Sequence, residues 1–316
     1  MVRLVKAKID LCDSYQANQN AQVKQLMTTY SNKDSYINLP SVQNQISPLI
    51  LSFGASDPVA GMGVQVDLAT FAALGCHGLP VITAILVGDT SQVDDVHAIE
   101  TDLVVDQART VLEDMPVQAF KLGQVASVET AAAIAEIISD YPDLPFILDP
   151  FSSSVPEPSA DAEDLLLAIC ELLIPQATLL IVSEAELGRI AETWRDPTFE
   201  EEVEDDLVAN VMTLIESGCS HVFVTGTTGQ DNQINNRLFD QNGLVRCDKW
   251  PRLPGAFVGA GSSLSAAITA LMANGLDVAA ATLEAQEFTN ASIQHAQRLG
   301  MGKLIPDRYF WAKESE

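Results

Sequence analysis

The sequence predicts an α/β domain whose mostly parallel central sheet is covered by helices on both faces. From Pro48 onward, short apolar runs alternate with longer amphipathic segments, and glycine or proline marks most of the joins. The runs are almost continuously apolar, which is typical of strands buried on both faces of a parallel sheet. We therefore expect one such domain over residues 48–316, with the recognisable alternation ending near residue 305.

Residues 1–47 differ from the rest of the chain in composition. They are rich in Gln, Asn, Ser and Lys, and only residues 21–30 show weak helical periodicity. We expect an N-terminal extension of unknown role.

The individual elements follow from the alternation. Each predicted strand has the length of a buried strand, and each predicted helix repeats its apolar residues with the helical period. The predicted strands are residues 49–53, 81–87, 119–122, 146–148, 179–182 and 222–225. The predicted helices are residues 64–74, 128–139, 162–173, 207–217, 263–273 and 279–299. An acidic run at residues 200–206 precedes one of these helices, which favours a solvated helix start over a metal site.

The charge composition excludes several classes of partner. The chain has 17 Lys and Arg residues against 43 Asp and Glu residues, which gives a net charge of −26 at pH 7. A field of that sign repels nucleic-acid phosphates and anionic lipid headgroups, so neither nucleic acid nor a membrane is an expected partner. An anionic substrate would have to be held by backbone amides, a metal ion and a few cations.

The cysteines and the N-terminus predict a cytoplasmic protein. The five cysteines are scattered, without the paired spacing of a zinc site or a disulfide framework, which fits a reducing compartment. The N-terminus lacks the apolar core of a signal peptide, and no apolar window of about eighteen residues predicts a transmembrane helix.

Two clusters of small residues precede predicted helices. The first, GASDPVAGMG at residues 54–63, matches neither the P-loop spacing nor a clean G-x-G-x-x-G, so a bare turn and a ligand-binding loop both remain open. The second, VGAGSSLSAA at residues 258–267, starts a helix whose free amides could bind an anion. Ser262 or Ser263 is also a competent N-cap, so a capped buried helix is the alternative.

Both clusters belong to a longer collinear pattern. The matching text is ASDPVAGMGVQVDLATFAALGCHGLPVITAI, FKLGQVASVETAAAIAEII, ILDP, LLIPQATLLIVSEAEL, VFVTG and GAGSSLSAAITALMANGLDVAAATLEAQEF, which covers nearly all of residues 49–305. In these segments the chain resembles the hydroxymethylpyrimidine and phosphomethylpyrimidine kinases of thiamine biosynthesis, within the ribokinase-like superfamily. The resemblance implies a three-layer α/β/α sandwich that uses ATP and Mg²⁺ to phosphorylate a primary hydroxyl on a small pyrimidine-type substrate. It also implies a homodimer.

The resemblance further implies three groups of site residues. The substrate-binding group is Asp67, with Ala60, Gly61 and Gly63 on the family's G-G-A-G turn and Gly88 on its A-Q-N-T segment. The nucleotide-binding group is Lys121, Thr225 and Gly226, with Asp149 and Glu186 as the metal-associated carboxylates. The catalytic group is Gly259, Ala260, Gly261 and Ser262, at the family's G-T-G turn, whose amides form the anion hole for the transferring phosphoryl group.

Four positions depart from the family's pattern. Ser262 stands where the family has a cysteine and most ribokinase relatives have an aspartate, so neither usual candidate base is present. Gly88 replaces a glutamine that helps to read the pyrimidine, while Ser183 replaces an asparagine and Thr225 replaces a lysine. Positioning and charge stabilisation supply most of the acceleration of phosphoryl transfer, and a general base adds roughly 10²- to 10⁴-fold. We therefore expect a slow enzyme rather than an inactive one.

Two other functions stay open. The combined losses are also expected of a catalytically impaired relative that binds a nucleotide or a pyrimidine as a sensor. A kinase for another hydroxymethyl heterocycle, such as pyridoxal, is disfavoured because those relatives resemble the aspartate-containing version of the anion turn.

Several conspicuous residues are interpreted as structural. His77 is expected in a solvent-facing loop between a helix and a strand, Cys76 as a small buried side chain, and His295 on the surface. Trp250 and Trp311 are expected in packing or an interface, because no basic surface accompanies them.

Overall fold

The computed structural model describes residues 47–151, 162–193, 207–228 and 233–312. The expected N-terminal extension, apart from residue 47, and the acidic run at residues 200–206 lie outside the described residues. Within the described ranges, no helix is both long enough and apolar enough to cross a membrane.

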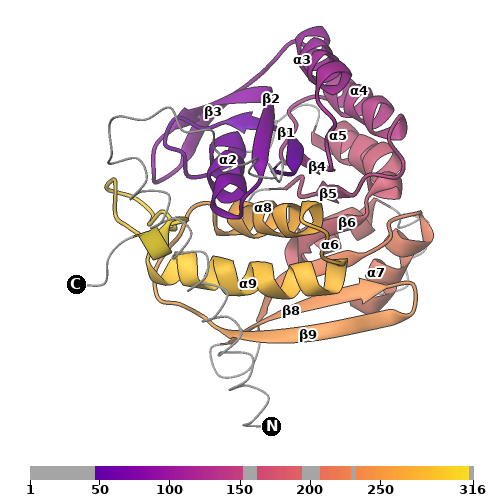
Figure 1. The fold of residues 1–316 in the computed structure, drawn as a ribbon. Helices are drawn as coiled ribbons and strands as arrows, with labels where there is room; N and C mark the ends of the chain where they lie inside the picture. Colours follow the sequence, from indigo (N-terminus) through magenta and orange to yellow (C-terminus); the bar gives the residue numbers. More distant parts are fainter. Residues whose placement is uncertain (1–46, 152–161, 194–206, 229–232, 313–316) are drawn as a thin grey trace, which may run out of the picture. The chain divides into compact units, whose positions relative to one another are not determined.

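A central sheet organises the fold (Figure 1). Its strands are β1 Leu49–Ser56, β2 His77–Gly88, β3 Val93–Ala98, β4 Ala119–Leu122, β5 Phe146–Leu148, β6 Leu179–Ser183, β7 Val222–Thr228, β8 Gln233–Asp240 and β9 Gly243–Pro251. In the part of the chain that the structure describes, they follow the order β3-β2-β1-β4-β5-β6-β7-β8-β9. The strands from β2 to β7 in that order run parallel, whereas β3 joins one edge antiparallel and the β8–β9 hairpin joins the other.

Strands in the parallel part of the sheet are buried on both faces, as their apolar runs predict. Along β1, Ile50 packs toward one layer of helices while Leu51 and Phe53 pack toward the other, and all three side chains are inaccessible to solvent. Burying a side chain of this size is worth about 1.5–3 kcal/mol. The residues that make the sheet therefore also make the core.

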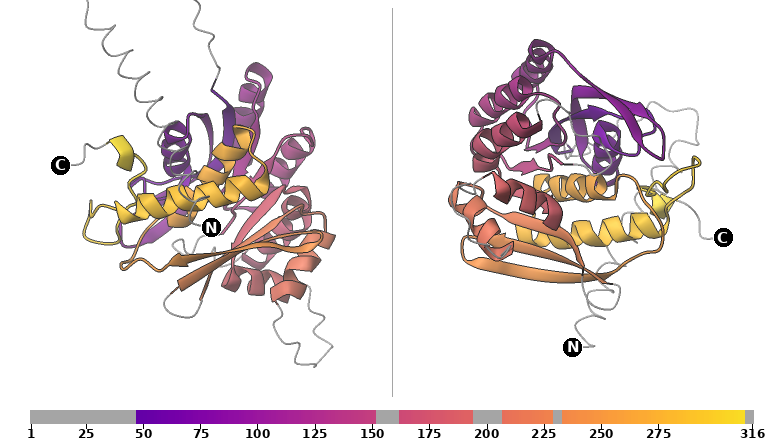
Figure 2. Two further views of the ribbon diagram at one scale, coloured as in Figure 1. Left: turned by 60° about the horizontal axis from the view of Figure 1, so that its bottom comes forward. Right: turned by 180° about the vertical axis from the view of Figure 1, so that it is seen from behind.

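Helices cover both faces of the sheet (Figure 2). They are α2 Gly63–Ala73, α3 Thr101–Asp114, α4 Val128–Ser139, α5 Ala162–Ala168, α6 Glu184–Glu192, α7 Leu207–Glu216, α8 Ala260–Ala273 and α9 Val278–Gln294. Helices α2, α8 and α9 pack on one face, and α3 to α7 pack on the other. The predicted three-layer α/β/α sandwich with a mostly parallel sheet is confirmed.

The structure also differs from the sequence pattern in several elements. Strands β3, β8 and β9 were not expected, because an antiparallel strand covered on one face mixes polar and apolar residues and lacks a continuous apolar run. Helices α3 and α6 were likewise missed, and both are strongly amphipathic. The helix predicted over 162–173 is α5 followed by a π-helical turn at Ile169–Leu173. Short 3₁₀ turns lie at Ile174–Gln176 and Phe310–Ala312.

The last long helix ends earlier than predicted. Helix α9 stops at Gln294 instead of continuing to residue 299. Beyond it, Gln297 exchanges two backbone hydrogen bonds with Ile305, of 2.9 and 3.0 Å. This pairing satisfies backbone groups that further helical turns would otherwise have used.

The strand order reverses at β1. Strand β2 pairs with one edge of β1 and β4 pairs with its other edge. The chain therefore passes from β1 to β2 on one side and later returns to β4 on the other. Ligands of open parallel sheets bind in the crevice at the carboxyl ends of the strands beside such a switch point. The topology therefore predicts a ligand site after residues 56 and 122.

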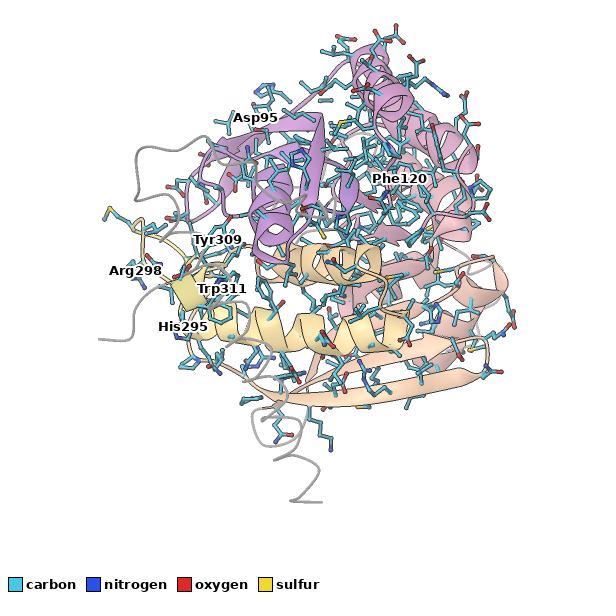
Figure 3. The ribbon with its side chains drawn as sticks, viewed as in Figure 1. Asp95, Phe120, His295, Arg298, Tyr309 and Trp311 are labelled. Carbon is cyan, nitrogen blue, oxygen red and sulfur yellow. The ribbon has the colours of Figure 1, made fainter. Side chains whose placement is uncertain are left out.

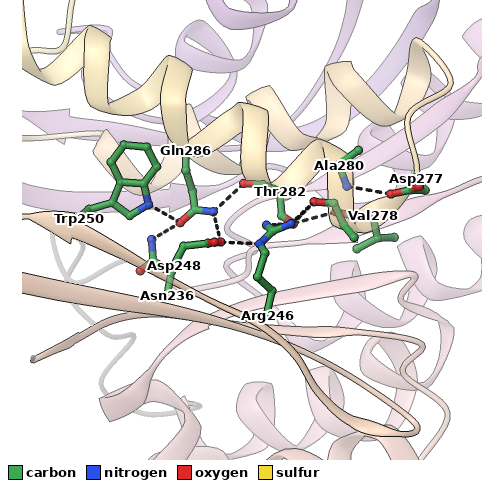
Figure 4. Close-up of polar contacts among 10 residues, drawn as sticks. Asn236, Arg246, Asp248, Trp250, Asp277, Val278, Ala280, Thr282 and Gln286 are labelled. Atoms are coloured by element: carbon green, nitrogen blue, oxygen red, sulfur yellow. Dashed lines mark hydrogen bonds and ion pairs between the residues drawn. The ribbon is translucent and has the colours of Figure 1, made fainter. Parts of the chain in front are cut away.

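A polar network joins the β8–β9 hairpin to α9 (Figure 4). Gln286 lies at its centre, because its Oε1 accepts hydrogen bonds of 2.8 Å from Trp250 Nε1 and from Asn236 Nδ2. Its Nε2 donates to Asp248 Oδ2 at 2.8 Å, and Arg246 Nε donates to the same oxygen at 2.8 Å. Buried groups of this kind need their partners, so the network fixes the helix against the hairpin.

Replacing Gln286 with leucine is expected to lower the free energy of unfolding by about 1–3 kcal/mol, because it leaves the Trp250 and Asn236 donors without their acceptor. Urea denaturation followed by circular dichroism measures the change. The matched control is Gln294→Leu at the exposed end of the same helix, which is expected to change stability by less than about 0.5 kcal/mol. Equal losses in the two variants would contradict a stabilising network.

Candidate active site

Two adjoining recesses open at the carboxyl ends of the parallel strands. The inner recess is lined by Gly54, Ala55, Met62, Gly63, Asp67, Leu86, Lys121, Gly123, Gln124, Asp149, Phe151 and Ser262. The outer cleft is lined by Met62, Asp149, Phe151, Ile181, Val182, Ser183, Glu186, Thr225, Phe257, Gly259, Ala260, Gly261, Ser262 and Leu264. Met62, Asp149, Phe151 and Ser262 line both, so occupants of the two recesses would meet there.

A buried ion pair lies in the inner recess. Lys121 Nζ is 3.0 Å from Asp67 Oδ1 and 3.1 Å from Oδ2, and both side chains are almost inaccessible to solvent. Ser52 Oγ donates a further hydrogen bond of 2.6 Å to Asp67 Oδ2. On β4, Phe120 and Leu122 point to the opposite face of the sheet, which directs Lys121 toward α2. An unpaired buried charge is costly, so each partner holds the other in place.

The loop between β1 and α2 is shaped by a buried aspartate. Asp57 Oδ2 accepts hydrogen bonds from the amides of Gly61 at 2.8 Å and Met62 at 2.9 Å. Gly63 follows with φ of +66°, and a Cβ there would lie 2.1 Å from the Ala55 carbonyl oxygen. Only glycine fits at that position, so the loop has a fixed path into the helix.

The turn before α8 presents backbone amides to the outer cleft. Gly259 caps the helix with φ of +79°, and Ala260, Gly261 and Ser262 are its first residues. The amide of Ser263 donates to the Gly259 carbonyl at 2.9 Å, which makes it the first amide bonded within the helix. The three preceding amides have no intrahelical acceptor and lie at the positive end of the helix dipole. Such a helix start binds anions.

The loop and the turn touch each other through glycine. A Cβ on Gly259 would lie 1.6 Å from the Gly61 carbonyl oxygen, so the two backbones are in direct contact. A Cβ on Gly261 would meet no atom within 4 Å, because it would point into the open cleft. The first glycine is therefore required by packing, and the second keeps space free for a ligand.

Asp149 lies where the two recesses meet. It follows β5, and its Oδ2 accepts a hydrogen bond of 2.6 Å from Ser265 Oγ. Loss of hydration raises the pKa of Asp149 to about 6, opposed by the attraction of Lys121 and by the Ser265 hydrogen bond, and reinforced by the repulsion of Glu186 and Asp67. The carboxyl group is therefore mostly ionised at neutral pH and mostly protonated below pH 6. A carboxylate in this state can bind a cation or accept a proton.

Two other predicted residues, Glu186 and Thr225, line the outer cleft, and a third, Gly226, follows Thr225 directly. Glu186 and Ser183 form a capping box on α6, in which Glu186 Oε2 accepts from the Ser183 amide at 2.7 Å. Thr225 lines the cleft from the middle of β7, where the pairing of this strand with β6 ends. Gly226 follows with φ of +71°, and its amide donates to Asn236 Oδ1 at 2.8 Å. The polar network of Figure 4 thus extends to the middle of β7.

The recesses bring together most of the site residues expected from the sequence. Gly63, Asp67 and Lys121 line the inner recess, Glu186, Thr225, Gly259, Ala260 and Gly261 line the outer cleft, and Asp149 and Ser262 line both. Across the described residues, no group of three or more His, Cys, Asp and Glu side chains could hold a metal ion by itself.

Four expected residues lie outside both linings, namely Ala60, Gly61, Gly88 and Gly226. Ala60, at φ of +52°, and Gly61 belong to the loop that packs against the turn before α8. Gly88 lies in an irregularity where β2 pairs with β3, and a Cβ there would lie 2.5 Å from the Gln92 carbonyl oxygen. Its glycine is explained by this close backbone approach.

Sequence reasoning missed several residues of the site. Gln124 and Phe151 line the inner recess, directly after the expected Lys121 and Asp149 segments, so their places beside those motifs could have identified them. Ser265 bonds Asp149 and lies three positions after Ser262, which puts both on one face of α8.

Two residues near the start of β2 are structural, as expected. Cys76 is buried, and its thiol donates to the Ala270 carbonyl of α8 at 3.5 Å. His77 is exposed but begins β2 instead of lying in a loop, because its amide donates to the Pro48 carbonyl at 2.8 Å beside β1.

The aromatic residues near the C-terminus pack on one another. His295, Tyr309 and Trp311 lie together at the C-terminal end of α9 (Figure 3). The exposed His295 ring stacks on Phe310 at a centroid distance of 5.5 Å, and Trp311 meets Phe310 edge to face at 4.9 Å. Trp250 packs between the hairpin and α9, so the expectation of packing roles holds for both tryptophans.

Comparisons with known proteins point to one family. A family model described as phosphomethylpyrimidine kinase matches residues 57–307. The chain is 28% identical over 263 residues to the hydroxymethylpyrimidine/phosphomethylpyrimidine kinase of Escherichia coli (strain K12), covering 83% of this chain and 97% of that protein. It is 30% identical over 264 residues to the kinase of the same description from Rhizobium meliloti (strain 1021), covering 82% and 95%. The ADP complex of Bacillus subtilis pyridoxal kinase has the same fold, with a TM-score of 0.74 at 23% identity over 84% of this chain and 99% of that chain.

Alanine substitutions at the two glycines of the turn are expected to have opposite effects. Gly261→Ala should leave the melting temperature unchanged or higher, because its Cβ meets no atom, but should weaken Mg·ATP binding at least about tenfold by crowding the amides. Gly259→Ala should lower the free energy of unfolding by at least about 2 kcal/mol, through its positive φ and the clash with Gly61. Calorimetric titration and thermal denaturation measure these effects. Unchanged Mg·ATP affinity in Gly261→Ala would remove the turn from the anion site.

The affinity for Mg·ATP is expected to fall as the pH drops through about 6, by up to about tenfold per pH unit. The sign follows from the raised pKa of Asp149, because the protonated carboxyl that predominates below pH 6 attracts no cation. The nucleotide phosphate also titrates near pH 6, so the readout is the difference between wild type and Asp149→Asn, measured by calorimetry from pH 5 to 8. Identical pH profiles for the two proteins would exclude Asp149 from the binding equilibrium.

Proposed function

This chain belongs to the phosphomethylpyrimidine kinase family, and we propose that it transfers the γ-phosphoryl group of ATP to the hydroxyl of hydroxymethylpyrimidine or to its phosphate, in the pyrimidine branch of thiamine biosynthesis. It is a phosphotransferase, as the family and the relatives described above are kinases. The observation that carries the proposal is that two recesses of different chemistry meet at Asp149 and Ser262.

The inner recess suits the acceptor. It offers the aromatic ring of Phe151, the amide of Gln124 and the charges of Asp67 and Lys121. A flat heterocycle with ring nitrogens and an amino group needs an apolar surface and a few polar groups of this kind.

The outer cleft suits the nucleotide phosphates. The amides of Ala260, Gly261 and Ser262 form the anion hole, and Thr225, which also lines the cleft and is followed by Gly226, is available to the rest of the nucleotide. Amides that are already oriented stabilise the negative charge that develops on the transferring group, and this stabilisation supplies most of the rate acceleration in phosphoryl transfer. Lys121 in the adjoining recess adds positive charge to a chain that is otherwise strongly acidic.

Asp149 and Glu186 would hold Mg²⁺. Both carboxylates line the outer cleft, and magnesium in phosphoryl-transfer enzymes is bound by one or two carboxylates together with substrate phosphates and water. Bound there, the ion would neutralise phosphate charge and orient the triphosphate. The pKa of Asp149, about 6, makes this carboxylate available at neutral pH.

A cytoplasmic homodimer is part of the proposal. Cys76, Cys170, Cys219 and Cys247 are free thiols, which suits a reducing compartment. Ile85 and Val87 are each 47% exposed on the side of β2 that faces away from the inner recess. A second copy of the chain could bury this apolar strip.

The test is ADP release from Mg·ATP in a coupled assay, with hydroxymethylpyrimidine, its phosphate and pyridoxal offered in parallel against a blank without acceptor. We expect release that depends on one of the two pyrimidines, with the phosphorylated product identified by mass spectrometry. A higher kcat/KM for pyridoxal would reassign the acceptor. No release, together with thermal stabilisation by ATP or pyrimidine, would indicate a sensor that has lost catalysis.

Ser262 is expected to limit the rate, because a hydroxyl without its own base is a poor proton acceptor. Ser262→Asp or Ser262→Cys should raise kcat at least about tenfold, within the range of a general base. Ser262→Ala is the matched comparison and should give no increase, since it supplies no base. Absence of a gain from both the aspartate and the cysteine variant would show that another step limits turnover.

A further inference from the structure

Arg308 is a buried cation just beyond the matched family segment, which ends at residue 307. Its side chain is only 6% exposed, whereas arginine is seldom buried without a specific partner. It lines neither the inner recess nor the outer cleft, so the roles proposed above do not use it.

The guanidinium of Arg308 bridges the two loops that form the reaction centre. Its Nε donates to Ser263 Oγ at 2.9 Å, and its Nη2 donates to the Gly61 carbonyl oxygen at 3.5 Å. Ser263 Oγ in turn donates to the Gly259 carbonyl at 2.8 Å. The bridge therefore lies where Gly61 and Gly259 touch. A planar group with donors in fixed directions is suited to holding two backbones together.

The charge of Arg308 remains available to the anion turn. Its contacts in the described part of the chain are with the Ser263 hydroxyl and with the carbonyls of Gly61 and Pro306, the last at 3.4 Å. Burial lowers the pKa of Arg308 to about 10, against the opposing effect of nearby acidic groups, of which Asp67 is the strongest. Arg308 is therefore cationic at neutral pH, behind the helix start that receives the phosphoryl group.

The segment that carries Arg308 is itself fastened to both sides of the site. We call residues 297–308 the C-terminal strap. Within it, the Leu304 carbonyl accepts a hydrogen bond of 3.0 Å from the amide of Val258, directly before the anion turn. The Lys303 amide donates to the Thr90 carbonyl at 2.8 Å, in the loop after β2. The guanidinium is thus held by a segment with two independent anchors.

We propose that Arg308 is a positioning residue for phosphoryl transfer, which locks the loop at Gly61 to the anion turn at Gly259 and directs positive charge toward the bound γ-phosphoryl group. This inference rests on the proposed function. Amides that stabilise a developing charge act only when they are held in place, and a displacement of about 1 Å can cost on the order of 10²-fold in rate. Arg308 supplies this constraint from the side of the turn that substrates do not reach.

A purely structural arginine would behave differently. Its loss would lower the stability of the protein and weaken the binding of every nucleotide to a similar extent. Loss of a residue that orders the anion turn would instead weaken the binding of nucleotides with a γ-phosphate and leave the binding of ADP, which has none, unchanged. The ratio of the two affinities therefore separates the two roles.

The experiment uses the full chain with Arg308→Ala and Arg308→Lys, and with Arg109→Ala as the matched control. Arg109 lies exposed on α3, paired with Glu136 and Asp140. Calorimetry with Mg²⁺ gives the affinities for ADP and for the non-hydrolysable analogue AMP-PCP, and the coupled assay gives kcat and KM. For Arg308→Ala we expect AMP-PCP affinity and kcat each to fall about 10- to 100-fold, with ADP affinity changed less than about twofold. The AMP-PCP affinity and kcat of Arg308→Lys should lie between those of the wild type and Arg308→Ala. An ammonium keeps the positive charge but cannot contact Ser263 and Gly61 at once.

Chemical rescue sharpens the test. Guanidinium at millimolar, non-denaturing concentration should restore part of the AMP-PCP affinity of Arg308→Ala, and urea, which is neutral and of similar shape, should not. Wild-type affinity ratios in both Arg308 variants would overturn the inference. If Arg308→Ala fails to fold, Arg308→Lys decides by the same ratio. An absence of turnover in the wild type would count against the proposed function alone, because the affinity ratio needs no turnover.

Discussion

The contact between the Lys121 ammonium and the Asp67 carboxylate ties three parts of the molecule to one buried point. Lys121 comes from β4, Asp67 from α2, and Ser52 of β1 completes the cluster. Removing either charge would leave the other buried and unpaired, at a cost of several kcal/mol. The same ammonium also opposes the rise in the pKa of Asp149, and so keeps that carboxyl ionised near neutral pH. Attachment of α2 to the sheet and the chemistry of the site therefore depend on one pair of charges.

An acidic chain can hold a polyanion only by concentrating its few favourable groups. With a net charge of −26, the surface as a whole repels a triphosphate. In the proposed site these groups are the backbone amides at the start of α8, Lys121 and the Arg308 guanidinium, and all of them are buried or backed by packed elements. Close approach of Gly259 to Gly61 brings these groups together without any side chain between them. The close packing of the two glycines is thus what allows these favourable groups to lie near one another.

Some parts of this structure were readable from the sequence and others were not. The strands that are buried on both faces could be predicted from their apolar runs. The clusters of small residues before α2 and α8 predicted the two loops of the site. The antiparallel strands β3, β8 and β9 could not be predicted, because their two faces differ and their pattern of polar and apolar residues is mixed. Gly88 was expected to contact substrate, but its place is set by a close backbone contact with Gln92 that no local pattern encodes. The place of Arg308 beside the site could not be predicted either, because its partners, Gly61 and Ser263, lie far from it along the chain.

That distance has a consequence for how the protein is made. Arg308 and Gly61 are 247 positions apart, and Gly259 comes after all of the described strands in the sequence. A ribosome delivers the strands of the sheet first, and domains fold as their segments emerge. The face of the sheet that carries Ile50 is closed only when α8 has emerged, because Ala266 and Ala270 of this helix pack in the same cluster. The core on that face and the anion turn at Gly259 are therefore completed by the same segment of chain, and a chain that lacks α8 would lose both.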